Sequence, residues 1–191
     1  MKKEFTKYVN PGLVITTNMI SLLRKTLFEQ LGQKQAGKYL LKLGRELGEE
    51  KARELLSVSG DTGELLEMAE FLHKDIGHIS HLNKRGTITK TDDGVILKNA
   101  RGSWQDSFEV AAHLQYFERA EECTCYIISG FMSGVISEIY GTDIFVKETT
   151  CIAKGDEVCS YEINTRGYWE SQGEALPIYE TDTFIGELEM T

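Results

Sequence analysis

Apolar residues in the first part of the chain recur every three or four positions, which is the spacing of one face of an α-helix. Thr17 or Asn18 offers an N-cap to a first helix, and Gly32 is placed to end it. A second helix is predicted from about Lys34 to Leu56, and a third over residues 61–76. The apolar stripes of the first two helices are Ile20, Leu23, Leu27, Leu31, Ala36, Leu40, Leu43 and Leu47.

Small residues on the second helix predict a close contact with another element. Gly44 and Gly48 are four residues apart and therefore share one face of the helix. Glycine in a helix costs stability, so its presence there indicates that a second backbone approaches closely. Gly130 and Gly134, in a later helix, have the same spacing and permit the same close approach.

After residue 78 the helical spacing gives way to weak alternation, which favours strands. The turn signal Asp92-Asp93-Gly94 predicts a hairpin. The predicted elements are a hairpin of residues 78–89 and 95–103, a helix over 108–117, a helix from Cys123 to Tyr140, and a hairpin of residues 143–152 and 157–164. Helices followed by antiparallel hairpins predict an α+β fold, in which N-terminal helices pack on an antiparallel sheet and a C-terminal helix lies beside the last hairpin.

Length and net charge narrow the class of protein. The 191 residues suit one domain, which we expect over residues 1–165, followed by an acidic tail over 166–191. A formal net charge of -9 argues against a surface that binds nucleic acid. No apolar stretch is long enough to span a bilayer, and we find no signal peptide. We therefore expect a cytoplasmic protein with no membrane partner.

Charge is unevenly distributed along the chain. Residues 1–56 hold 11 Lys or Arg against 6 Asp or Glu, whereas residues 167–191 hold 6 Asp or Glu and no Lys or Arg. Solvent-exposed faces account for both segments, because surface charge pairs contribute little energy. The alternative is that the acidic tail docks on the basic helices of the same chain or of a partner chain.

Residues with metal-binding side chains gather around the last hairpin. Cys151 and Cys159 lie four residues on either side of Gly155, so a turn centred there brings them face to face. Cross-strand neighbours are about 4.5–5.5 Å apart, which suits a shared metal ion or a disulfide. Glu148 lies three residues before Cys151 and reaches the same point only if the strand bulges between the two residues.

Cys125 is predicted to lie in the first turn of the helix that begins at Cys123, where the helix dipole favours a thiolate. Three thiolates and one carboxylate are acceptable ligands for a closed tetrahedral zinc site, which has no open position for catalysis. A reducing compartment favours metal ligands over a disulfide. A disulfide or free thiols remain the alternatives at this point, and Cys123 is expected to be a free thiol.

The same residues resemble a known family. Cys125 opens a helix with the run Gly130-Phe131-Met132-Ser133-Gly134, and the patterns E-x-x-C (148–151) and G-D-x-x-C (155–159) follow. This set is similar to the 4-vinyl-reductase-like domain family, and to the N-terminal sensory domains of phenol- and xylene-responsive transcription activators. The resemblance covers about residues 104–165 and is looser in the upstream helices.

The resemblance implies a structural zinc ion held by Cys125, Glu148, Cys151 and Cys159. It also implies an aromatic-lined ligand pocket, for which the candidate residues are Trp104, His78, Phe108, Tyr126 and Phe131. Burial in the core is the alternative for the aromatic residues, and a helix C-terminal cap is the alternative for His78. The resemblance further implies a homodimer to which residues 1–60 contribute, and a fold like that of nitric-oxide sensors and vesicle-tethering subunits.

These observations favour a stand-alone sensor that binds a small hydrophobic or aromatic molecule. The sequence has no GxxxxGK[ST] loop and no GxGxxG fingerprint, and we assign no catalytic residue. We therefore expect a binding protein rather than an enzyme. Two alternatives remain: an accessory or enzyme component of tetrapyrrole vinyl reduction, and a scaffold protein of the vesicle-tethering kind.

Overall fold

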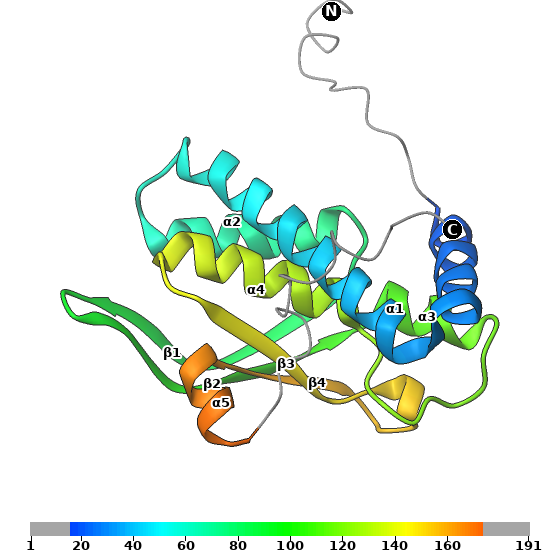
Figure 1. The fold of residues 1–191 in the computed structure, drawn as a ribbon. Coiled ribbons are helices and arrows are strands. Elements are labelled where there is room, and N and C mark those ends of the chain that lie inside the picture. The colour runs from blue at the N-terminus through cyan, green and yellow to red at the C-terminus, as the bar shows by residue number, and fades with distance from the viewer. Residues whose placement is uncertain (1–15, 174–191) are drawn as a thin grey trace, which may run out of the picture.

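Helices cover one face of a four-stranded antiparallel sheet, which confirms the predicted α+β fold (Figure 1). The computed structural model describes residues 16–173, and the remainder of the predicted dimerisation segment and of the acidic tail lies outside this range. The helices are α1 (Thr17–Leu56), α2 (Thr62–Asp75), α3 (Phe108–Leu114), α4 (Tyr126–Tyr140) and α5 (Arg166–Ser171). Among the described residues, no helix combines the length and the apolar character needed to cross a membrane.

Helix α1 joins the first two predicted helices through a kink. Gly32 adopts φ 74° and ψ 156°, which is outside the helical region and which glycine reaches without a steric cost. The predicted break is therefore in the right place. The N-cap is Thr16, one residue before the predicted position, and its side chain accepts a hydrogen bond from the backbone N of Met19 at 3.3 Å. Helix α2 begins as predicted, because Asp61 accepts a hydrogen bond from the backbone N of Glu64.

The predicted apolar stripe of α1 is only partly buried. Ala36 and Leu40 lie in the core, but Leu23, Leu31, Leu43 and Leu47 are each 42–45% exposed. Before the kink, the buried face instead consists of Ser21, Arg24 and Phe28. That part of the prediction was wrong, because Arg24 is buried by an ion pair with a residue distant in sequence, and helical spacing does not reveal such a partner.

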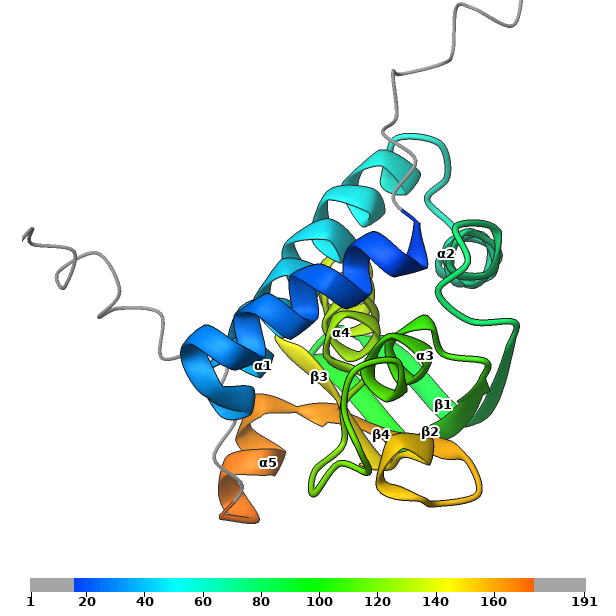
Figure 2. The same ribbon diagram turned by 90° about the vertical axis from the view of Figure 1, so that its right-hand side faces the viewer.

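Helices α1 and α4 touch through their glycines, as predicted. A Cβ atom on Gly44 or Gly48 would clash with a backbone carbonyl of α4, at Ile127 or Phe131. Gly130 and Gly134 of α4 face the backbone of α1 in the same way. Helix α4 is buried along nearly its whole length, and it lies between α1 and the sheet (Figure 2). It is therefore the central element of the core.

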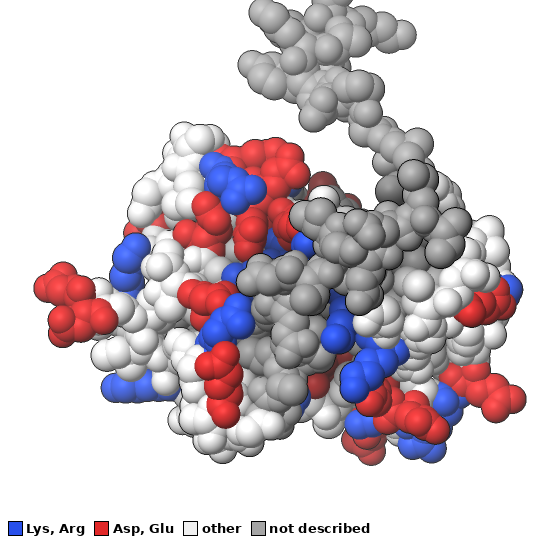
Figure 3. All heavy atoms as spheres, in the orientation of Figure 1, with Lys and Arg blue, Asp and Glu red and all other residues white. Residues whose placement is uncertain are grey.

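The strands are β1 (His81–Thr91), β2 (Gly94–Gln105), β3 (Ile144–Thr150) and β4 (Cys159–Thr165), in the order β1-β2-β4-β3. The first hairpin turns at Asp92-Asp93 as predicted. A short 3-10 helix, η2 (Ile152–Lys154), and a turn at Gly155 connect β3 to β4. Helix α5 was not predicted, and it places Trp169 in a buried position. On the face in Figure 3, acidic side chains gather at the tip of the first hairpin, and both signs are interspersed elsewhere.

Candidate metal centre and ligand cavity

A bulge in β3 brings Glu148 and Cys151 to the same point, as the sequence required. Glu148 pairs with Tyr161 of β4, whereas Thr150 pairs with Ser160, so Thr149 is an extra residue in β3. The bulge shifts the alternation of side chains by one position. Glu148 and Cys151 can therefore share a side of the chain, although a regular strand would separate them.

Cys125 immediately precedes α4 as its N-cap residue. The prediction that it lies in the first turn of a helix starting at Cys123 was wrong, because the helix begins at Tyr126. Cys125 makes no side-chain capping hydrogen bond. The buried carboxylate of Glu109 takes that role, since its Oε2 accepts a hydrogen bond from the backbone N of Ile128 at 2.9 Å. The sulfur of Cys125 is therefore available to the hairpin.

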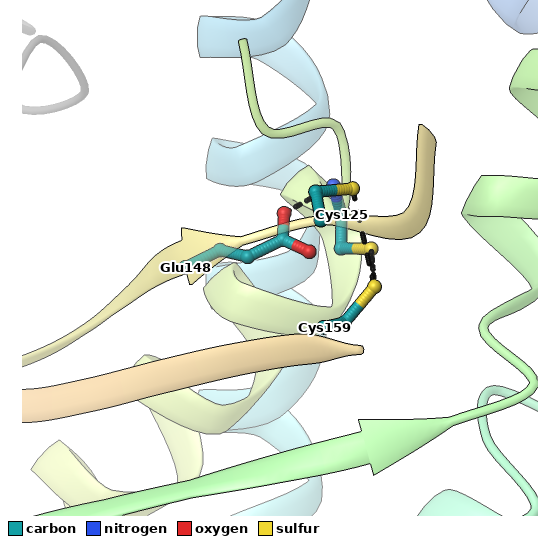
Figure 4. Close-up of side chains that lie close together, drawn as sticks. Cys125, Glu148 and Cys159 are labelled. Atoms are coloured by element: carbon teal, nitrogen blue, oxygen red, sulfur yellow. Dashed lines mark hydrogen bonds between the residues drawn. The ribbon is translucent and has the colours of Figure 1, made fainter. Parts of the chain in front are cut away.

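The four predicted ligands converge (Figure 4). One ligand atom from each of Cys125, Glu148, Cys151 and Cys159 lies within 4.8 Å of all the others. The sulfur of Cys159 is 3.9 Å from that of Cys125 and 3.9 Å from that of Cys151. A regular tetrahedron with Zn–S bonds of about 2.3 Å sets its sulfurs about 3.8 Å apart, so the spacing fits zinc. The structure has no disulfide at this site, and all four cysteines are free thiols.

The electrostatics of the cluster also suit a cation. Burial raises the pKa of the Cys125 thiol and the pKa of the Glu148 carboxyl. Hydrogen bonds from the thiols of Cys125 and Cys159 lower the pKa of Cys151. The four groups therefore cannot all lose their protons at neutral pH unless a positive charge balances them. Glu148 Oε1 is buried without a hydrogen-bond partner, while its Oε2 accepts from the backbone N of Cys125 at 2.9 Å.

Neighbouring groups fix the orientation of the sulfurs. Ser107 Oγ is 3.2 Å from the sulfur of Cys125, and Thr124 Oγ1 is 3.5 Å from that of Cys151. The backbone N of Ile152 donates to the sulfur of Cys159 at 3.4 Å. Such contacts orient ligands and stabilise negative charge on them. Cys123, by contrast, stays outside the cluster, and burial raises its thiol pKa to about 12.

A buried ion pair ties the first part of α1 to this region. Arg24 and Glu109 are 1% and 0% exposed, and their Nη1 and Oε1 atoms are 2.8 Å apart. Arg24 Nη2 also donates to the carbonyl of Thr124 at 2.7 Å, next to Cys125. The sequence analysis missed this pair, since neither residue stands in a recognisable motif.

An apolar cavity of about 280 Å³ lies between α2, α4 and the sheet. Its walls include Ala69, His73, Leu82, Phe131, Val135 and Tyr161. Of the predicted ligand residues, only Phe131 lines this cavity. Trp104 lies behind the wall, where it is fully buried and stacks on Tyr161 at a ring-centroid distance of 5.0 Å. Its Nε1 has no hydrogen-bond partner.

The other predicted ligand residues fall into two groups. His78 and Phe108 stack on each other at 5.1 Å, and His78 meets Phe131 edge-on at 5.4 Å. Tyr126 lies elsewhere, against Gly37 of α1 and 5.3 Å from the guanidinium of Arg24. The sequence analysis missed His73, which lines the cavity and whose Nδ1 is 3.0 Å from Nδ1 of His78. Its signal was its place on the buried side of α2, five residues before His78.

Comparison with known proteins agrees with this geometry. Residues 103–165 match the family model of the vinyl-4-reductase domain. This segment is a vinyl-4-reductase domain. The resemblance inferred from the sequence is therefore confirmed.

Along most of its length the chain is also similar to sensory proteins. It is 25% identical over 185 residues to the phenol regulator MopR of Acinetobacter guillouiae, covering 94% of this chain and 32% of MopR. The chain thus spans about a third of the length of the curated relatives it matches. The phenol-responsive sensory domain of the transcription activator PoxR superposes with a TM-score of 0.78 at 25% identity, over 90% of this chain and 85% of that one.

The predicted likeness to vesicle-tethering subunits is also found. Subunit 3 of a trafficking protein particle complex from Naegleria fowleri gives a TM-score of 0.51 at 16% identity, over 78% of this chain and 93% of that one. At this identity the likeness concerns the fold alone.

Proposed function

We propose that this chain is a small-molecule-binding sensory domain whose ligand is a small aromatic molecule with one polar group. The cavity carries this proposal, because it combines apolar walls and aromatic rings with a buried polar atom, His73 Nε2, that has no partner. Leaving such an atom unpaired costs about 1–3 kcal/mol, and a ligand with a polar group would remove that cost. The cavity also favours binding over the scaffold alternative, for which we would expect a filled core.

The ligand class follows from the walls and from the relatives. Apolar pockets with a few placed polar groups bind small hydrophobic molecules and orient them through those groups. MopR is described as a phenol regulator and PoxR as phenol-responsive, which supports phenols and molecules of similar shape as candidates. In the proposed complex the apolar body of the ligand packs on Phe131 and Val135.

We also propose that Cys125, Glu148, Cys151 and Cys159 hold one structural zinc ion. The support is the tetrahedral spacing of the sulfurs and the unpartnered Glu148 Oε1. Four protein ligands leave no position for a substrate, so the ion would join the start of α4 to the β3–β4 hairpin. Trp104 pairs with Cys159 across β2 and β4, so the same ion would steady the strands behind the cavity.

Calorimetric titration of the zinc-loaded protein with phenol and with indole tests the binding proposal. We expect saturable binding of at least one of them at one site per chain. An absence of binding for both, at protein and ligand concentrations that would detect a millimolar dissociation constant, would contradict the proposal.

Trp104→Phe tests the role predicted for that residue. The change keeps an aromatic ring and removes the unpartnered indole N–H, so we expect about fivefold weaker phenol binding, the value of one neutral hydrogen bond. Trp169→Phe is the matched control, because Trp169 is also buried with an unpartnered Nε1 but does not line the cavity. Equal affinities in the two variants would assign Trp104 to the core alone.

The expected homodimer and the cytoplasmic location stay predictions. Four exposed apolar side chains on the first part of α1, Met19, Leu22, Leu23 and Leu31, support the dimer.

A further inference from the structure

Two histidines at the end of α2 meet at the cavity. His73 lies in the last turn of α2, and Gly77, with φ +76°, turns the chain so that His78 comes back against it. The two Nδ1 atoms are 3.0 Å apart, which is a hydrogen-bond distance. His73 is 3% exposed and lines the cavity, and its Nε2 is buried without a partner.

The contact restricts where the protons of the pair can be. Burial lowers the pKa of His73 to about 3 and that of His78 to about 4, so both rings are neutral at pH 7. A neutral imidazole carries one N–H and one bare nitrogen. Because one Nδ1 must donate to the other, one ring has its proton on Nδ1 and the other has it on Nε2. His73 Nε2 is therefore a donor in one arrangement and an acceptor in the other.

We propose that His73 is the residue that determines which polar groups the cavity accepts, and that His78 positions it by exchanging tautomers with it. This inference rests on the proposed function. With His78 donating, His73 Nε2–H binds a ligand that offers an acceptor, such as a carbonyl oxygen. With His73 donating, its bare Nε2 binds a ligand that offers a hydroxyl or N–H group. The cavity thus takes aromatic molecules of either kind.

The exchange between the two arrangements conserves charge on each ring. The shared proton passes from His78 Nδ1 to His73 Nδ1. His73 then releases its Nε2 proton to water, and His78 Nε2 takes a proton from water, so both rings end neutral. His78 is less buried than His73, which gives its Nε2 the easier exchange with solvent. A ligand selects between the two arrangements by its differential affinity for them.

The ring packing explains why His73, and not His78, contacts the ligand. His78 is held between Phe108, on which it stacks, and Phe131, which it meets edge-on. His73 packs on the Phe131 ring at 4.6 Å from the cavity side. His78 therefore acts on the ligand through His73.

Nitrogen-15 NMR of the full-length, zinc-loaded protein with labelled histidine reads the tautomers directly. Indole offers only a donor, and acetophenone offers only an acceptor. We expect indole to leave His73 Nε2 bare with the proton on Nδ1, and acetophenone to give the reverse, with His78 changing in the opposite sense. The same His73 tautomer with both probes bound would overturn the inference.

Affinity measurements on His73→Phe complete the test. We expect this variant to bind indole and acetophenone about fivefold more weakly and to bind toluene as the wild type does, since toluene makes no polar contact. His81→Phe, which changes an exposed histidine of β1, is the control. If no probe binds, toluene included, the proposed function itself fails. If all three bind alike in both proteins, only the role of His73 is refuted.

Discussion

His73 and His78 show at the scale of single residues how burial controls charge near the cavity. Both rings lie among aromatic side chains, and desolvation disfavours their charged forms. A histidine in an unfolded chain has a pKa near 6.5. Between pH 6.5 and about 3, the unfolded chain therefore binds a proton at His73 that the folded chain does not bind.

This difference makes the stability depend on pH. The contribution of His73 is fully present above pH 6.5, and it is lost as the pH falls towards 3, by about 1.4 kcal/mol per pH unit. From pH 7 to pH 5 we expect a loss of about 2 kcal/mol from His73 in the wild type, and no such loss in His73→Phe. Urea unfolding at both pH values measures it. His81→Phe should keep the wild-type loss, and an unchanged loss in His73→Phe would disprove the assignment.

The metal-binding residues could be predicted from the sequence, but the polar residues of the core could not. Cys151, Cys159 and Glu148 are close along the chain, and the bulge that unites them follows from their spacing. His73 and Arg24 carry no such local signal. Their burial depends on His78 across a glycine turn and on Glu109, which is 85 residues away from Arg24.

At the scale of elements, the part of α1 before Gly32 is joined to α3 and α4 by one buried ion pair. Arg24 contacts Glu109 of α3, and Glu109 in turn accepts a hydrogen bond from the backbone of α4. Burial raises the pKa of Glu109, while the Arg24 guanidinium acts in the opposite direction. Removing Arg24 would leave the carboxyl buried without its cation, which is more costly than losing the pair as a whole.

Arg24→Met should therefore lower the free energy of unfolding by about 3–5 kcal/mol. Lys25→Met, on the next residue, is the control, because the exposed Lys25–Glu29 pair contributes less than about 1 kcal/mol. Adding Glu109→Gln to Arg24→Met should recover part of the loss, since no charge then remains buried. Denaturant unfolding of the four proteins measures these values. Similar stabilities for Arg24→Met and Lys25→Met would contradict the role of the ion pair.

The order and type of the elements followed from local patterns, but the exposure of their faces did not. The turn at Asp92-Asp93, the cap at Asp61 and the glycines at the α1–α4 contact all have local physical causes. Apolar spacing placed α1 correctly, yet Leu23 and Leu31 are exposed. Spacing identifies a helix and cannot tell whether the core or another surface covers a given stripe.

At the scale of the whole molecule, the account links three parts: the β3–β4 hairpin with its metal ligands, the central helix α4, and the cavity beside it. Cys125 stands at the start of α4, and Phe131 of the same helix lines the cavity. Trp104 pairs with Cys159 on one side, and its ring packs on a cavity wall on the other. An ion bound by the cluster would therefore hold both the helix and the strands that frame the ligand.

Elemental analysis of the freshly purified, reduced protein tests this arrangement most directly. We predict one zinc ion per chain, retained in Cys123→Ser and lost in Cys159→Ser, because Cys123 lies outside the cluster and Cys159 within it. The absence of a stoichiometric metal from the wild-type protein, or an equal loss in the two variants, would contradict the account.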